Sequence, residues 1–373
     1  MGIFIFSVDQ LSDSGLPNYP ETKFKSHDNR KTSTDQIQML HLFTRIARPT
    51  GFFALLLCTG TTWAQADDQS FESDEGEPQS TETEGAPAEE TEDTFSWNVA
   101  GGDIYQFDTD IDGGGSYSVN RTFLGAGMEF EYSPALTLDF DIGMEWDNYD
   151  FSGSGDFTAP AAGDPWSQVF DLTLSAVSRW KLDDNWRMIL GGFVRWSGES
   201  DADFAESFSG GAVFGGAYVF SDDLSLGATA LVTTQIEDGL LWIPSPIVDW
   251  RINRQLFISN MRGPVTYPAS LGLEIVYYLN ENMNLSLGGR YEYRRFRLND
   301  DGPAAIRNGV GGERTFPVWV RFEWRPIEQI RLHVLAGVNF GQRLELENSS
   351  GTLLSEEDTD PSPFIGCFLD FKF

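Results

Sequence analysis

The stretch LTLDFDIGMEW, Leu136–Trp146, decides the fold class because its residues alternate strictly between two kinds. One parity is entirely apolar and comprises Leu136, Leu138, Phe140, Ile142, Met144 and Trp146. The other parity comprises Thr137, Asp139, Asp141, Gly143 and Glu145. Because successive side chains of a β-strand point to opposite faces of the sheet, this stretch predicts a strand with one apolar face and one acidic face.

Two classes of protein use such strands. In a soluble sandwich the apolar face packs against a second sheet, whereas in a transmembrane barrel it meets lipid and the polar face lines the lumen. Several alternating segments run for ten or more residues, which exceeds the usual five or six of globular strands and matches the roughly nine to eleven that cross a bilayer. Aromatic residues also gather near the strand ends on the apolar parity, as in the girdles of membrane barrels. These are Trp146, Trp180, Trp186, Trp196, Tyr291, Tyr293, Phe322 and Trp324.

The pattern therefore predicts an all-β chain that forms a transmembrane, up-and-down antiparallel β-barrel over residues 95–373. Tight turns alternate with longer loops along this region, as in outer-membrane barrels. Counting on that basis gives about fourteen strands, an even number as bacterial single-chain barrels have. Twelve strands is the alternative count, because Pro244, Pro246, Pro264 and Pro268 interrupt any ladder that they join. A secreted soluble β-sandwich is the alternative fold.

The segment PFIGCFLDFKF, Pro363–Phe373, has the pattern of a final strand, with Phe371 and Phe373 on its apolar parity. It resembles the assembly signal of Gram-negative outer-membrane β-barrel proteins, whose last strand ends in phenylalanine and is read by the barrel insertion machinery. The resemblance implies an outer-membrane location and that machinery as a partner. Phe368 stands where that signal usually has glycine. The block PIVDWRINRQL, Pro246–Leu256, and the strands after it also resemble an outer-membrane barrel family described only as a domain of unknown function, which implies no activity.

The first part of the chain carries an export signal. The stretch from Met39 to Asp68 has a basic flank, an apolar run over residues 51–63 and a small-x-small site at Ala64 and Ala66, which predicts a secretory signal peptide over residues 39–66. Residues 1–38 are polar, and we interpret them as a mis-set start or a disordered leader. Residues 67–94 hold one large apolar residue, Phe71, among acidic and small ones, and so predict a disordered acidic linker.

The composition limits the partners. The chain has 57 acidic and 25 basic residues and a formal net charge of -32, which repels phosphate backbones and argues against nucleic acid. Outer-membrane lipids and lipopolysaccharide are the expected surroundings. Cys58 falls in the predicted signal peptide and Cys367 is alone in the final strand, so no internal disulfide is predicted. The glycine pairs of the barrel region precede no helix, so no phosphate loop and no cofactor are predicted.

Placing the apolar parity outward turns many charged side chains toward the lumen. A basic residue at the lipid midplane costs about 2–4 kcal/mol, so several of them facing outward would exceed a net stability of roughly 5–15 kcal/mol. The residues predicted to line the lumen are Glu129, Glu131, Asp139, Asp141, Glu145, Asp171, Arg179, Arg187, Arg195, Arg290, Arg294, Arg321, Arg325, Arg331 and His333.

Two interpretations of this lumen compete. Acids on the early strands and arginines on the later ones would set a transverse field across a water-filled pore. Alternatively, neighbouring acids and arginines pair and knit the interior into a salt-bridged plug. We favour the pore, because fourteen strands enclose more volume than their own side chains readily fill.

The stretch DTDIDGGG, residues 108–115, partly matches a calcium-binding loop. Asp108, Asp110 and Asp112 occupy alternate positions, as in the first half of a calcium loop. The twelfth position is Val119 rather than glutamate, so an ordinary acidic hairpin loop is the preferred interpretation and no metal site is predicted.

Catalysis is not predicted either. His333 is the one histidine after the predicted cleavage site, and no serine accompanies it in RLHVLAG. The sequence therefore predicts a porin-like passive channel for small polar solutes, with a sealed structural or surface-adhesion barrel as the alternative.

Overall fold

A computed structural model of the chain describes residues 94–260 and 272–373. The predicted start, the signal peptide with Ala64 and Ala66, and residues 67–93 of the predicted linker lie outside the described residues, as does the segment 261–271. No helix in the two described ranges is long and apolar enough to cross a membrane.

The strands are β1 Thr94–Asp110, β2 Ser116–Ser133, β3 Leu136–Ser152, β4 Gln168–Lys181, β5 Trp186–Glu199, β6 Phe208–Ser221, β7 Leu224–Gln235, β8 Asp238–Arg251, β9 Leu256–Asn260, β10 Leu273–Asn280, β11 Met283–Gly289, β12 Glu292–Arg297, β13 Val310–Ile327, β14 Ile330–Glu347, β15 Leu353–Asp358 and β16 Ser362–Lys372. Two short 3-10 helices, η1 Ala159–Ala161 and η2 Ala205–Ser207, lie in loops.

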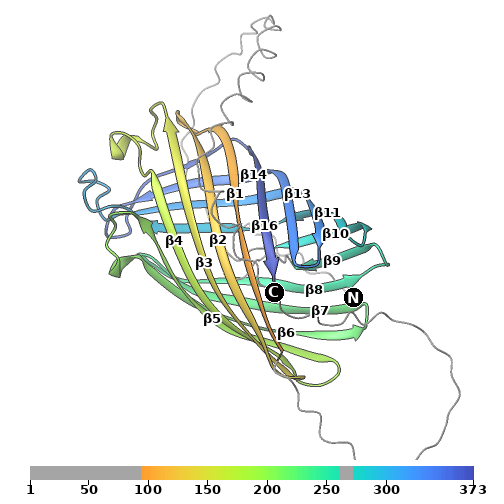
Figure 1. Ribbon diagram of the computed structural model, residues 1–373. Helices are drawn as coiled ribbons and strands as arrows, with labels where there is room; N and C mark the ends of the chain where they lie inside the picture. Colours follow the sequence, from red (N-terminus) through yellow and green to blue (C-terminus); the bar gives the residue numbers. More distant parts are fainter. Residues whose placement is uncertain (1–93, 261–271) are drawn as a thin grey trace, which may run out of the picture. The chain divides into compact units, whose positions relative to one another are not determined.

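These segments form one closed antiparallel sheet. From β1 to β11 each strand pairs with the next along the chain, and the order then continues through β13, β14 and β16. β16 pairs with β1 from Asn98↔Lys372 to Gln106↔Phe364, which closes the barrel (Figure 1). β12 extends β11, and β15 extends β16, so the sixteen described segments make fourteen strands. The prediction of a fourteen-strand antiparallel barrel is confirmed, and the two-sheet sandwich is wrong.

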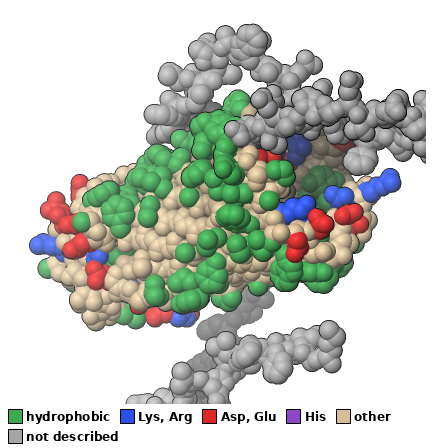
Figure 2. All heavy atoms as spheres, turned by 90° about the horizontal axis from the view of Figure 1, so that it is seen from below, with side chains coloured by type: hydrophobic (Ala, Val, Ile, Leu, Met, Phe, Trp, Pro, Cys, Tyr) green, Lys and Arg blue, Asp and Glu red, His purple; other side chains and the backbone are tan. Residues whose placement is uncertain are grey.

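The predicted alternation separates the two faces of the wall. On β3, Phe140 and Ile142 are exposed on the outer face, whereas Glu145 is buried in the interior. Figure 2 shows green apolar side chains over the middle of the visible surface, with most of the visible charged side chains toward its two ends. An outward apolar band with charges beyond it is the surface that a bilayer covers in β-barrels.

The barrel has two different ends. The end with the tight turns, which also holds Phe373, is called the turn end; the end with the loops at residues 153–167 and 298–309 is called the loop end. Near the loop end the alternation inverts: on β3, Tyr149 and Phe151 point inward and are buried, and Asn148 and Asp150 are exposed. Apolar-inside and polar-outside is the pattern of a protein core in water, so the strand ends here extend past the apolar band.

β12 departs from the simple barrel order. β11 pairs with both β10 and β13, but β12 pairs with β13 alone along its length and meets β5 at Arg297↔Gly198. The strand therefore crosses to a distant part of the wall at the loop end. Two parts of the interior are named by what they hold. The core side holds the buried apolar cluster at the loop end, which β12 contacts. The cavity side holds a larger space beside β5–β9 and the turn-end halves of β3 and β4.

This crossing corrects the expected place of Tyr293, which was assigned to an interface girdle. The Tyr293 hydroxyl donates to Glu345 Oε2 at 3.3 Å, so it belongs to the polar surface of β12 that lies away from the core side. Arg295 beside it is buried and donates to the carbonyl oxygen of Ile236 at 2.9 Å and to Glu347 at 2.7 Å. Sequence alternation cannot show that a strand leaves the wall.

Candidate functional site

The candidate site is the barrel interior, where most of the residues predicted to line the lumen lie, whereas Glu131 is exposed. They differ in surroundings: some lie in a buried charge network on the core side, some near the turn end, and some beside a cavity on the cavity side.

At the loop end the core side is filled by an apolar cluster, here called the loop-end core. Its aromatic rings interlock, with the Trp166 ring centroid 5.1 Å from that of Phe296 and 5.4 Å from that of Phe151. The full cluster is Ile111, Tyr117, Val119, Tyr149, Phe151, Phe157, Ala161, Trp166, Val169, Phe296, Leu298, Ile306, Leu344 and Leu346. Each of these side chains is buried, so the cluster closes this part of the interior to water.

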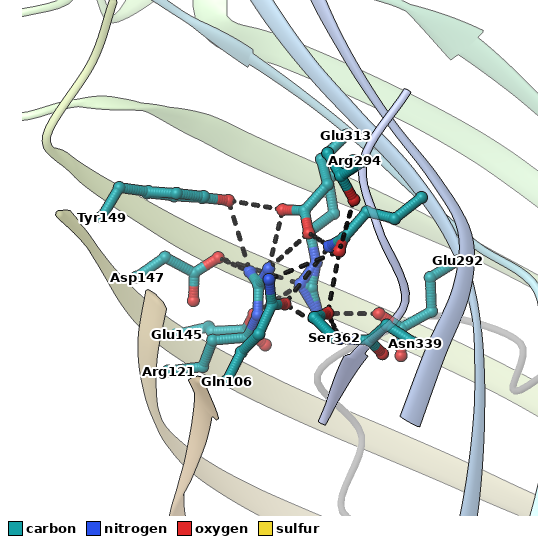
Figure 3. A network of polar contacts seen from close by, with 12 residues as sticks. Gln106, Arg121, Glu145, Asp147, Tyr149, Glu292, Arg294, Glu313, Asn339 and Ser362 are labelled. Carbon is teal, nitrogen blue, oxygen red and sulfur yellow. Dashed lines mark hydrogen bonds and ion pairs between the residues drawn. The ribbon is translucent and has the colours of Figure 1, made fainter. Parts of the chain in front are cut away.

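A network of charged side chains lies next to this core (Figure 3). Arg121 on β2 pairs with Asp147 on β3 and with Glu313 Oε2 on β13 at 2.7 Å. Arg294 on β12 pairs with Glu145 Oε1 at 3.0 Å. All five side chains are buried, so each charge depends on its partners for compensation.

Neutral groups complete the network. The Tyr149 hydroxyl donates to Glu313 Oε2 at 2.7 Å, and Gln342 Nε2 donates to Glu313 Oε1 at 2.7 Å. Asn339 Nδ2 in turn donates to Gln106 Oε1 at 2.9 Å. Connected polar networks of this kind fix side-chain positions, because any broken link leaves a further buried polar group unpaired.

Three further ion pairs extend the network. Arg195 pairs with Asp171 at 2.7 Å, and Glu292 pairs with Arg290 and, at 3.3 Å, with Arg294. The acids and arginines on the core side are therefore bonded to one another, and this side has the salt-bridged arrangement of the second interpretation rather than facing walls of opposite charge.

Toward the turn end, a small aromatic cluster lines the core side. It comprises Phe123, Trp319, Leu335, Phe364 and Phe368. The His333 ring stacks on that of Phe368 with ring centroids 4.2 Å apart. A cavity of about 100 Å³ separates this cluster from the charge network.

Other charged side chains toward the turn end are also paired. Arg321 pairs with Glu274 at 2.6 Å, and both side chains are buried. Nearer the turn end, Arg331 pairs with Asp370 at 3.0 Å. Arg325 lies 3.4 Å from Glu323, one of the acids that the sequence reasoning did not select.

The cavity side contains the larger space. A cavity of about 670 Å³ is lined by residues of the turn-end halves of β4 to β9 and of the turns beside them, and at about 30 Å³ per molecule it has room for roughly twenty waters. Its lining includes Arg179, Lys181, Arg187, Ser225 and Asp249. The inward face of β7 carries small side chains here, since Gly227 and Thr229 lie on the same face of the strand as Ser225.

Two predicted residues, Arg179 and Arg187, line this space, and the predicted acids named below lie on the neighbouring strands β2 and β3. Arg179 pairs with Glu129 on β2 and with Asp139 Oδ1 at 2.6 Å. Asp141 accepts a hydrogen bond from Ser175 at 3.2 Å. Arg187 donates to the carbonyl oxygen of Asp183 at 2.8 Å. Glu131, nearer the turn end, is exposed.

The other candidates from the sequence lie at the barrel rim. Asp108, Asp110 and Asp112 are exposed, and the one group of carboxylates in the described ranges whose ligand atoms converge is a different one, formed by Glu145, Asp147 and Asp171. Phe373, the last residue, donates its main-chain N–H to the Trp97 carbonyl oxygen at 2.8 Å.

The sequence reasoning missed several interior charges: Arg121, Asp147, Glu274, Glu313 and Glu323. The sequence did contain a signal for Arg121 and Asp147. Arg121 shares the interior parity of β2 with the predicted residue Glu129, and Asp147 shares that of β3 with the predicted residue Glu145. No sequence signal identifies the partner of each arginine.

No family model matches the chain, and no curated protein does. Among solved structures, the chain is similar to an outer membrane channel from Pseudomonas putida F1, at 10% identity over 78% of this chain and 100% of that chain, with a TM-score of 0.42. It is also similar to the P. putida toluene transporter TodX, at 7% identity over 77% of this chain and 90% of that one, with a TM-score of 0.37. A third match is the KdgM porin, at 9% identity over 74% and 99%, with a TM-score of 0.31.

Proposed function

We propose that the chain is an outer-membrane barrel, exported through the secretory pathway, whose cavity side passes small polar solutes passively. The turn end then faces the periplasm and the loop end faces outward, as in bacterial outer-membrane barrels. Membrane lipid and lipopolysaccharide would cover the outward apolar band, and the barrel insertion machinery would read the last strand. The proposal includes no catalysis.

The observation that carries this proposal is the uneven filling of the interior. On the core side, a packed apolar cluster and buried ion pairs leave a space of about 100 Å³. On the cavity side, a space of about 670 Å³ has small and charged residues in its lining. Proteins retain open volume with some charged groups in its lining where solutes bind or pass, so the expected pathway is narrow and displaced to one side of the barrel.

The test is planar-bilayer recording on the refolded barrel with two tryptophan variants at adjacent positions. Ser225 lines the cavity, and Leu226 is exposed on the outer face of the same strand. The wild type should give small, discrete current steps; Ser225→Trp should reduce their size, and Leu226→Trp should leave it unchanged. Equal steps in both variants would place the pathway elsewhere, and a correctly folded but silent wild type would show that the barrel does not conduct.

A second candidate is a sealed structural or surface-adhesion barrel. The observation that favours it is the closure of the core side at the loop end, where β12 meets β5 and the loop-end core fills the space between them. The same recording separates the two, because a sealed barrel gives no steps while remaining folded.

A further inference from the structure

Three buried carboxylates on the core side converge on one point. Glu145 and Asp147 come from the inward face of β3, and Asp171 comes from the adjacent β4, directly across from Glu145. One potential ligand oxygen of each lies within 4.8 Å of the others. Like charges at this separation repel strongly in a buried site unless something neutralises them.

Each of the three carboxylates is bonded to an arginine through one of its oxygens. Arg195 donates to Asp171 Oδ1 at 2.9 Å, and Arg294 donates to Glu145 Oε1 at 3.0 Å. Arg121 donates to Asp147 Oδ2. The other oxygen, Asp147 Oδ1, has no hydrogen-bond partner although the residue is only 1% exposed.

Two hydroxyl groups without partners flank the same point. Ser197 lies directly across from Asp171 on β5, and its Oγ has no hydrogen-bond partner at 1% exposure. Thr173, the next inward residue after Asp171 on β4, is likewise buried with an unpartnered Oγ1. Native proteins rarely leave several buried oxygens unpaired in one place, so the cluster points to a bound group that pairs with them.

The charge count favours a cation. The buried acids of this region are Glu145, Asp147, Asp171, Glu199, Glu292 and Glu313. The guanidinium groups among them are Arg121, Arg195, Arg290 and Arg294. Six negative charges against four positive ones leave an excess of two. Arg321 and Glu274 form a neutral pair of their own. Uncompensated charges in a dry interior are strongly unfavourable, and one divalent cation removes the excess.

We propose that Glu145, Asp147 and Asp171 bind one Ca²⁺ ion, with the Ser197 hydroxyl as a neutral ligand and Thr173 as a second. All of these donors are oxygen atoms, the type that Ca²⁺ takes in flexible arrangements of six to eight ligands. The ion holds β3, β4 and β5 together beside the loop-end core. It serves the structure of the barrel and does not depend on solute passage. Because the site is buried, the ion enters during folding and leaves slowly.

The test refolds the full chain in Ca²⁺ or in a chelator, passes it through a gel-filtration column in metal-free buffer, and measures retained metal by mass spectrometry. The wild type should retain about one Ca²⁺ per chain, as a single site of this kind requires. Asp147→Asn should retain little. Asp139→Asn removes a carboxylate from the same strand outside the cluster, and it should retain as much as the wild type.

A second variant, Ser197→Ala, tests the site even if Asp147→Asn does not fold. Ser197→Ala removes one hydroxyl group and leaves every charge in place. It should fold and bind Ca²⁺ about tenfold or more weakly in a titration during refolding, the size of effect that loss of one supporting group produces. A folded wild type without retained metal would overturn the proposal. Equal binding by Ser197→Ala and the wild type would remove the hydroxyl from the site. Neither result bears on conductance.

Discussion

Replacing Leu174 with arginine tests which surface of the barrel meets lipid. Leu174 lies near the middle of β4 on the outer face and is 46% exposed. At the lipid midplane an arginine costs about 2–4 kcal/mol, which lowers the folding equilibrium constant by roughly 30- to 900-fold. The measurement is guanidinium unfolding, followed by tryptophan fluorescence, of the barrel folded into phospholipid vesicles.

The position of the substitution sets the size of the effect. Leu182, in the turn after β4, lies eight residues farther along the chain. That distance is about 26 Å along a strand and roughly 20 Å along the membrane normal after tilt, beyond the half-height of about 12 Å of the apolar band. Leu182→Arg should therefore cost about 0–1 kcal/mol.

Ser175 supplies the control for the other face. Its hydroxyl donates to Asp141 in the interior, so an arginine there gains a carboxylate neighbour and should change the stability by about 1 kcal/mol or less. A cost at Ser175 equal to that at Leu174, or no dependence on depth between Leu174 and Leu182, would refute the assignment of the outer face to lipid.

Three further predictions follow from particular contacts. Arg294→Met leaves Glu145 buried without its arginine and should cost about 3–5 kcal/mol in the same unfolding assay, with part recovered by adding Glu145→Gln; no loss would show that the pair is not required. The pKa of Asp183 is lowered because its carboxylate accepts hydrogen bonds from two main-chain N–H groups of its own turn. The ionised carboxylate therefore stabilises the folded barrel at pH values above the ordinary carboxyl range, and this contribution disappears as the pH falls through the lowered pKa. Asp183→Asn should therefore unfold at lower denaturant than the wild type near neutral pH and at the same denaturant in strong acid, and a constant difference would contradict this origin. Gly351 has φ +73°, and a Cβ there would lie 2.6 Å from the Glu237 carbonyl oxygen. Gly351→Ala should therefore destabilise the barrel by about 1 kcal/mol or more. An unchanged unfolding midpoint would contradict this strain.

The fold was predictable because its signal repeats along the whole barrel region. Alternation such as that of Leu136–Trp146 predicts to which face of the sheet each side chain points, without reference to distant residues. The tight turns predict the order of the strands in the sheet, since antiparallel neighbours in an up-and-down barrel follow one another in the chain. Both kinds of information are local.

The interior was predictable only in part, because its pairing is not local. Arg121 and Glu313 lie 192 residues apart, and no pattern in the sequence joins them. The crossing of β12 is not local information either, because the apolar parity inverts between Tyr293 and Phe296 without indicating which distant strand β12 meets. One readable signal was missed: on β3 the apolar parity inverts at Tyr149 and Phe151, and this inversion marks where the wall leaves the apolar band and begins to enclose a protein core.

The most direct test of the central claim asks which half of the interior water-soluble reagents can reach. Single cysteines at Ser225 in the larger cavity and at Thr315 on the core side are introduced after Cys367, the free cysteine of the described strands, is replaced by alanine. A charged thiol reagent is then added during planar-bilayer recording. Ser225→Cys should react and lose current, and Thr315→Cys should keep its current. Loss of current at Thr315 alone, or at neither site, would contradict a pathway along the cavity side.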